Sequence, residues 1–257
     1  MSIDGFKLEQ TAAFAGYSGA AASRFYRRVE QLMNLLRIEV QGVEQIPPAQ
    51  ALIVGNHTFG WDATFPMSAV FRATGRPVWA LGEHLWWKIP LLRRLASAVG
   101  TVDGTPENVD RLLAEEQLVL VLPGGLREAV KPRELRYRLL WGHRYGFIRA
   151  AIRNRAPIVP LAAIGADDFF DFVGDPFARG RRWLHRPGFP IPRPSRLLPI
   201  PHFVPLRFVF GEPIPMPDDV DLEHDEVTVR RLRREVEGAL HELIETELAR
   251  RAGIDCG

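Results

Sequence analysis

Short apolar runs recur along the chain, each bounded by glycine or proline and each too short for a helix. They lie at residues 51–54, 78–81, 118–122, 158–162 and 206–210. Runs of this length predict buried strands. The segments between them have the composition of helices, at residues 63–73, 88–98, 106–116 and 142–154. Because strands alternate with helices, we expect an α/β fold with a mostly parallel central sheet flanked by helices.

Longer amphipathic helices are predicted at the two ends of the chain. Apolar side chains recur every three or four residues within 10–38 and within about 225–251, with charged side chains on the other faces. We therefore expect one domain over residues 1–257. Its parts are an N-terminal amphipathic region (1–40), a central core (50–215) and a C-terminal helix (220–257).

Composition supports a single globular domain. The 257 residues are 46% hydrophobic and 25% charged, with a mean hydropathy of −0.08, and a chain of this length can bury one large core. Cys256 is the single cysteine, which excludes disulfides within the chain and cysteine-based metal clusters. We expect no signal peptide, because the N-terminus has no basic head followed by an apolar core, and no transmembrane helix, because no stretch approaches eighteen uninterrupted apolar residues. Any membrane contact would be peripheral.

Charge is unevenly distributed, although the net charge is only +2. Basic side chains crowd residues 131–155 and 179–196, whereas residues 218–226 are strongly acidic. The basic regions are either solvated surface or a face that meets the phosphates of lipid or cofactor. No nucleic-acid-binding motif is present, so we expect no nucleic-acid partner. The proline-rich stretch 174–205 should be irregular, and it either packs on the core or offers an apolar and basic surface.

The first candidate for chemistry is the stretch ALIVGNHTFGWD, residues 51–62. Ligands of open α/β sheets bind at the carboxyl ends of the strands, where His57 falls. Asp62 can reach His57 if the histidine precedes a helix and the aspartate lies in its first turns. Asp62 would then fix the imidazole tautomer and leave the other nitrogen as a base. Alternatively, Asn56 or Thr58 caps a helix and His57 is an ordinary polar residue.

A second buried strand ends in a glycine-rich turn, Leu122-Pro123-Gly124-Gly125-Leu126-Arg127-Glu128. Two glycines let backbone N–H groups approach a ligand closely, so the turn could donate to an oxyanion or a phosphate. The alternative is a plain strand-to-helix turn that carries a surface Arg–Glu pair.

Together these stretches resemble the glycerolipid acyltransferases, most closely the diacylglycerol and monoacylglycerol acyltransferase branch. The resemblance rests on Asn56-His57-(four residues)-Asp62 followed by Pro123-Gly124-Gly125-Leu126-Arg127-Glu128. It continues through Arg144-Tyr145-Gly146-Phe147, Ala156-Pro157-Ile158-Val159-Pro160 and Gly165-Ala166-Asp167-Asp168, and so covers about residues 50–215 in order.

The resemblance implies acyl transfer from acyl-CoA or acyl carrier protein to a hydroxyl, without a metal or other cofactor. It implies His57 as the general base and Asp62 as the residue that orients it. Substrate-binding roles are implied for Pro123, Gly124, Gly125, Arg127, Glu128, Arg144 and Pro160. Glu128 could instead be structural, through a salt bridge to a nearby arginine, and Pro160 could shape the pocket.

Departures from the family pattern narrow the expectation. Pro-Gly-Gly stands where phosphate-acceptor members carry Glu-Gly-Thr-Arg, and residues 99–104 lack the arginine of their second motif. Both favour a neutral or bulky acceptor, although the basic region 131–155 could supply charge. We expect a peripheral protein on the cytoplasmic side of a membrane, with the N-terminal helix or 174–205 at the lipid. The alternatives are an acyl thioesterase and a non-catalytic lipid-binding protein.

Overall fold

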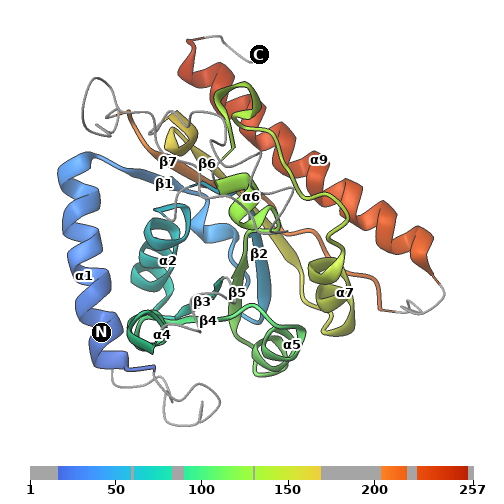
Figure 1. Cartoon of the computed structure of the whole chain (residues 1–257), viewed down its shortest axis with the longest axis horizontal. Helices are drawn as coiled ribbons and strands as arrows, with labels where there is room; N and C mark the ends of the chain where they lie inside the picture. Colours follow the sequence, from blue (N-terminus) through green and yellow to red (C-terminus); the bar gives the residue numbers. More distant parts are fainter. Residues whose placement is uncertain are drawn as a thin grey trace, which may run out of the picture.

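The computed structural model describes residues 17–58, 61–82, 90–129, 131–168, 204–218 and 225–253, without the side chains of Trp61, Asp62 and Leu92. In this part of the chain, seven strands form one sheet in the order β1-β7-β6-β2-β5-β3-β4 (Figure 1). The strands are β1 (Glu39–Gln41), β2 (Ala51–Gly55), β3 (Val78–Gly82), β4 (Thr101–Asp103), β5 (Leu118–Val121), β6 (Ile158–Ile164) and β7 (Arg207–Phe210). Neighbouring strands are parallel except β6 and β7. The predicted mostly parallel α/β sheet is confirmed.

Helices cover both faces of the sheet (Figure 1). They are α1 (Gly19–Leu36), α2 (Trp61–Thr74), α4 (Pro90–Ala98), α5 (Pro106–Ala114), α6 (Gly125–Ala129), α7 (Gly146–Arg153) and α9 (Glu226–Arg251), with short 3₁₀ turns η3 (Val43–Gln45), η4 (Arg133–Leu135) and η5 (Ala166–Asp168). Helices α1 and α2 pack on one face, against Ile53 and Leu120. Helices α5, α7 and α9 pack on the other, against Leu52 and Val119. Both faces of the central strands are buried, which explains their continuous apolar runs.

Local signals explain most of the boundaries. Thr105 caps α5 by accepting a hydrogen bond from the N–H of Asn108 at 3.3 Å, and Pro106 occupies the first helical position. Helix α1 begins after Ser18, whose hydroxyl accepts from the N–H of Ala21. Helix α7 begins at Gly146, four residues later than predicted, because Gly142 has a left-handed φ of +56° that a helix does not accommodate.

Several expectations lie outside the described residues. They include the start of the predicted helix 10–38 and most of the proline-rich stretch 174–205. Among the residues described, none of the helices combines the length and the apolar character that crossing a bilayer requires.

Candidate active site

His57 lies just beyond the carboxyl end of the central strand β2. The strand ends at Gly55, and α2 starts at Trp61, so Asp62 is the second residue of that helix. His57 therefore precedes a helix whose first turn carries Asp62, which is the backbone arrangement that an interaction between the two residues requires. The side chain of Asp62 lies outside the described residues, and its contact with His57 stays a prediction.

The buried side chain of Asn56 fixes the backbone immediately before His57. Its amide nitrogen donates to the carbonyl of Ala163 at 3.0 Å, and its amide oxygen accepts from the N–H of Ala163 at 2.7 Å. The side-chain amide thus replaces one backbone pairing between β2 and β6, where β6 continues past the end of β2. Asn56 thus anchors the sheet. This differs from the alternative drawn from the sequence, in which Asn56 caps a helix.

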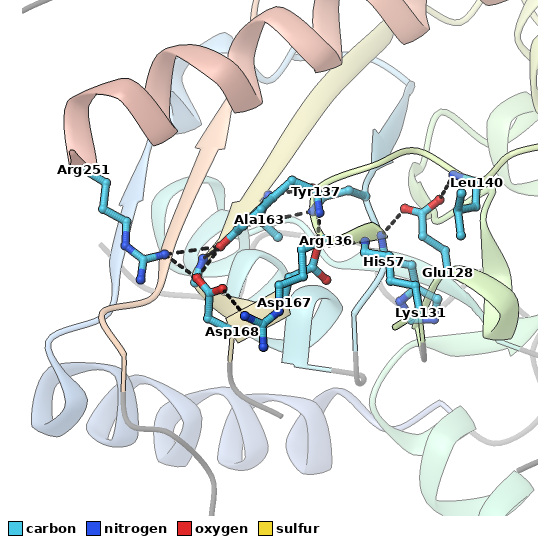
Figure 2. Close-up of polar contacts among 12 residues, drawn as sticks. His57, Glu128, Lys131, Arg136, Tyr137, Leu140, Ala163, Asp167, Asp168 and Arg251 are labelled. Atoms are coloured by element: carbon cyan, nitrogen blue, oxygen red, sulfur yellow. Dashed lines mark hydrogen bonds and ion pairs between the residues drawn. The ribbon is translucent and has the colours of Figure 1, made fainter. Parts of the chain in front are cut away.

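Glu128 holds His57 from the other side (Figure 2). Its carboxylate is fully buried, and one oxygen accepts from the backbone N–H of His57 at 2.7 Å. The other oxygen accepts from the backbone N–H of Leu140, also at 2.7 Å. The described partners of Glu128 are therefore backbone groups, and no arginine ion pair is found for it among the described residues.

The glycine-rich turn is shaped around this carboxylate. A Cβ atom on Gly124 would lie 2.1 Å from Oε2 of Glu128 and 2.3 Å from its Cβ, so only glycine fits here. Gly125 adopts a φ of +53°, and its N–H closes the turn onto the carbonyl of Leu122 at 3.0 Å. Gly124 thus makes room for Glu128, and Gly125 reverses the chain into α6.

Burial raises the pKa of Glu128 above its ordinary value, while the charge of Lys131 and the two backbone N–H groups act in the opposite direction. Lys131 itself makes a buried ion pair with Asp167 at 2.8 Å. Burial likewise raises the pKa of Asp167, against the opposing effect of Lys131. The back of the site is thus a water-excluded cluster of charges, in which losing one partner would leave another uncompensated.

A further set of contacts ties this cluster to the last turn of α9 (Figure 2). The N–H of Tyr137 donates to Asp167 at 2.6 Å, and its hydroxyl donates to Asp168 at 2.7 Å. Arg136 and Arg251 both pair with Asp168. The segment 131–145 is therefore fastened at several points between the strand ends and the C-terminal helix.

A cavity of about 1110 Å³ opens in front of His57, at the carboxyl ends of β2, β3, β4 and β5. One wall comes from α1, α2 and their surroundings and is mainly apolar: Phe25, Ala63, Met67, Ala80 and Val99. The opposite wall comes from α7 and the segment before it and carries His143, Arg144, Arg149 and Arg153. Asp103 and Glu107 also line the cavity, so its charge is mixed.

The arginines of this wall differ in their partners. Arg149 pairs with Glu226, and Arg153 binds both carboxylate oxygens of Asp110. The guanidinium of Arg144 donates to the backbone carbonyl of Pro123, which links the glycine-rich turn to the start of α7. Arg144 is thus held by a neutral partner at the cavity wall.

The structure divides the site residues predicted from the sequence into two groups. Those that line the cavity are His57, Pro123, Gly125 and Arg144. Outside the described lining, Gly124 lies within the turn and packs against the buried Glu128, Arg127 is exposed, and Pro160 is buried within β6, where its carbonyl accepts from the N–H of Gly211. Their roles in substrate binding stay predictions.

Sequence reasoning missed the anchoring role of Asn56 and the backbone partners of Glu128. Lys131, Arg149 and Arg153 were noted only as members of a basic region. Among the described residues, no group of three or more histidine, cysteine or acidic side chains is arranged to hold a metal ion.

Comparisons with known proteins show which sequences this chain resembles. A family model described as Acyltransferase matches residues 37–164, which include His57 and the glycine-rich turn. The chain is 32% identical over 223 residues to an uncharacterised protein of Mycobacterium tuberculosis, covering 81% of this chain and 62% of that protein. It is 31% identical over 209 residues to the human DGAT1/2-independent enzyme synthesizing storage lipids, covering 80% of this chain and 60% of the human protein. The chain thus spans about three fifths of the length of these relatives.

The fold has a match of its own among solved structures. The crystal structure of the 1-acyl-sn-glycerophosphate acyltransferase PlsC from Thermotoga maritima superposes with a TM-score of 0.51 at 15% identity, covering 84% of this chain and 79% of that chain. Sequence and fold therefore define an acyltransferase domain. The match over residues 37–164 and the named relatives support a glycerolipid acyltransferase family for this chain, and the likeness to PlsC shows the fold.

Proposed function

We propose that this protein transfers a fatty acyl group from an acyl thioester, acyl-CoA or acyl carrier protein, to the hydroxyl of a lipid or other alcohol. The observation that carries the proposal is the position of His57, on the wall of a large cavity and beside the glycine-rich turn. The cavity volume of about 1110 Å³ exceeds the roughly 300–1,000 Å³ of ordinary small-molecule pockets, which suits a site that holds two substrates.

His57 is the general base in the proposed reaction. Its imidazole takes the proton of the acceptor hydroxyl as the oxygen attacks the thioester carbonyl carbon. The tetrahedral intermediate then collapses, the carbon–sulfur bond breaks, and the imidazolium returns the proton to the leaving thiolate. The alcohol is itself the nucleophile, so the protein forms no covalent intermediate. Asp62, early in α2, orients the imidazole and stabilises its charged form.

The two walls of the cavity divide the substrates between them. The apolar wall with Phe25 and Met67 accommodates the acyl chain, because buried methylene groups need an apolar surface. The opposite wall offers Arg144, a cation held by a backbone carbonyl, to an anionic or carbonyl group of the donor. The neutral or bulky acceptor favoured by the departures from the family motifs would then approach His57 from the open side.

The test is thiol release from palmitoyl-CoA, followed with a thiol-reactive dye, with and without a panel of alcohols. Release that requires an alcohol and is lost in His57→Ala supports acyl transfer. His57→Ala should keep the fold, because the contacts of Glu128 and Asn56 that hold the backbone at this position do not involve the imidazole. Release without alcohol would instead indicate a thioesterase. Carrier-bound donors come next if palmitoyl-CoA is inert, and failure of both favours the non-catalytic alternative.

A further inference from the structure

Helix α4 presents an unusual apolar surface to solvent. Leu91 is 67% exposed and Leu95 is 59% exposed, and they are among the few large hydrophobic side chains exposed in the described part of the chain. Residues four apart in a helix lie on one face, so the two leucines form one apolar patch. Isolated exposed leucines need no explanation, but a paired patch on a short surface helix does.

The charged side chains of α4 and of residues 19–29 of α1 all have the same sign. Arg93 and Arg94 are exposed on α4, and α4 contains no acidic residue. The neighbouring half of α1, residues 19–29, carries Arg24, Arg27 and Arg28, all exposed, and likewise contains no acidic residue. Apolar side chains flanked by arginines are the composition of interfacial helices that bind anionic membranes.

The two helices form one surface, and it adjoins the cavity. The hydroxyl of Tyr26 in α1 donates to the carbonyl of Val99, just after α4, at 2.9 Å. The N–H of Ser18 donates to the carbonyl of Ala98 at 3.4 Å, and the start of α1 lies beside α4 (Figure 1). Phe25 and Val99 both line the cavity, on the wall assigned to the acyl chain. The basic and apolar surface therefore lies on the outside of that wall.

We propose that α4 and residues 19–29 of α1 form a docking surface for an anionic lipid bilayer. Leu91 and Leu95 insert between the headgroups, and the arginines of both helices contact lipid phosphates. Docking in this orientation brings the apolar wall of the cavity next to the bilayer, where acyl chains and lipid alcohols reside. The inference deepens the proposed function by naming the surface through which the lipid arrives, but its test requires no catalysis.

The experiment is co-sedimentation of the whole chain with vesicles of phosphatidylcholine, alone or mixed with phosphatidylglycerol. We expect wild type to bind the mixed vesicles more strongly. The double variant Leu91→Glu/Leu95→Glu should lose about tenfold in binding, because two carboxylates replace inserted side chains. The matched control is Val227→Glu on α9, the helix that packs on the opposite face of the sheet from α1. Val227 is 76% exposed, and the variant should bind like wild type.

A second pair of variants tests the charges. Arg93→Glu/Arg94→Glu should lose the preference for phosphatidylglycerol. Arg230→Glu/Arg231→Glu, an adjacent exposed pair on α9, should keep it. Any of three results would overturn the proposal. They are an equal loss of vesicle binding in the patch and control variants, no loss of binding in the leucine variant, and a wild type that binds neither kind of vesicle. So would a change in oligomeric state of Leu91→Glu/Leu95→Glu, measured by size-exclusion chromatography with light scattering, because the patch would then contact another copy of the chain.

Failure of the docking surface is separable from failure of the proposed function. His57→Ala should bind vesicles like wild type, because the histidine is not on this surface. Conversely, Leu91→Glu/Leu95→Glu should retain its rate with a short-chain thioester and a soluble alcohol, and lose activity only when the acceptor is embedded in vesicles.

Discussion

The backbone N–H of His57 donates to the buried carboxylate of Glu128 at 2.7 Å, although the two residues lie 71 positions apart. This contact joins the two motifs of the site, the one that ends β2 and the one that follows β5. The hydrogen bond is made by the backbone N–H of His57, so it fixes the position of the residue and uses neither ring nitrogen. In the proposed reaction Glu128 is therefore a positioning residue, whose effect would pass through His57.

Glu128→Gln should lower both stability and activity. An amide group has one acceptor oxygen, so its NH₂ must face the N–H of either His57 or Leu140, and one buried donor stays unsatisfied. We expect a loss of about 1–3 kcal/mol in the free energy of unfolding and a lower kcat for thiol release. Urea unfolding and steady-state kinetics measure the two effects. The matched control is Glu134→Gln, an exposed carboxylate on the same segment, which should change neither. Wild-type kcat in Glu128→Gln would remove it from the positioning role.

Gly124→Ala should destabilise the fold, because the new methyl group would lie 2.1 Å from Oε2 of Glu128. The carboxylate would have to move away from His57, with a cost of roughly 1–3 kcal/mol that is typical of overpacking. Thermal melting and urea unfolding report this cost. Gly238→Ala in α9 is the opposite case, since its new methyl group meets nothing within 4 Å. It should stabilise the protein by about 0.5–1 kcal/mol through better helix propensity. Equal stability of the two variants would refute the packing of Glu128 against Gly124.

Arg144→Gln should raise KM for acyl-CoA more than KM for a thioester that lacks phosphates, such as an acyl-N-acetylcysteamine. The reason is that the guanidinium lies at the cavity wall with a backbone carbonyl as its neutral partner, so its charge is available to an anionic donor. We expect about a tenfold rise for acyl-CoA, as for loss of one charge-assisted hydrogen bond. Arg138→Gln, exposed on the same segment, serves as the control. An identical rise in KM for both thioesters would instead indicate that Arg144 only supports the turn.

Phe25→Ala should shift the preference toward longer acyl chains, because Phe25 lines the apolar wall and its removal enlarges the cavity there. The ratio of kcat/KM for a long saturated chain to that for a short one should rise by about tenfold. The comparison variant is Phe71→Ala, which removes a partly buried ring near Tyr26 that is not among the described lining residues. It should cost stability but leave the ratio unchanged. A shift in neither variant would place the acyl chain elsewhere.

The central strands could be predicted from the sequence because both of their faces are buried. In β2 and β6 every residue is buried, and an unbroken apolar run is the result. Strands β1 and β4 were missed because each has three residues, of which only Val102 is buried. Such short edge strands form by pairing with a neighbouring strand, and they are too short to show a hydrophobic period in the sequence.

The place of His57 could also be predicted, since a strand that ends in Gly-Asn-His presents the histidine at the ligand-binding edge of the sheet. The contact between His57 and Glu128 could not be predicted. Glu128 binds backbone N–H groups, which every residue except proline carries, so no complementary side chain in the sequence reveals the contact. The same holds for Asn56 and the backbone of Ala163.

Tyr26 joins α1 to the segment after α4, and it should make stability depend on alkaline pH. Its hydroxyl donates to the carbonyl of Val99 at 2.9 Å, and burial raises its pKa well above the ordinary value of 10.0, with a further contribution from Tyr17. Between the unfolded and folded pKa values, the native state keeps a proton that the unfolded chain loses. The contribution of Tyr26 is therefore fully present below pH 10 and falls by about 1.4 kcal/mol per pH unit above it.

The variant Tyr26→Phe isolates this contribution. At pH 8 it should be less stable than wild type by about 0.5–1.5 kcal/mol, the net value of a hydrogen bond. As pH rises above 10, only wild type carries the cost of keeping the hydroxyl protonated, so the difference between the two proteins should shrink and then reverse. Urea unfolding at a series of pH values measures it, and charges shared by both proteins cancel in the difference. A stability difference between the two proteins that stays constant up to pH 11 would mean that the hydroxyl loses its proton in the folded protein. The segment after α4 would then separate from α1 before the rest of the protein unfolds.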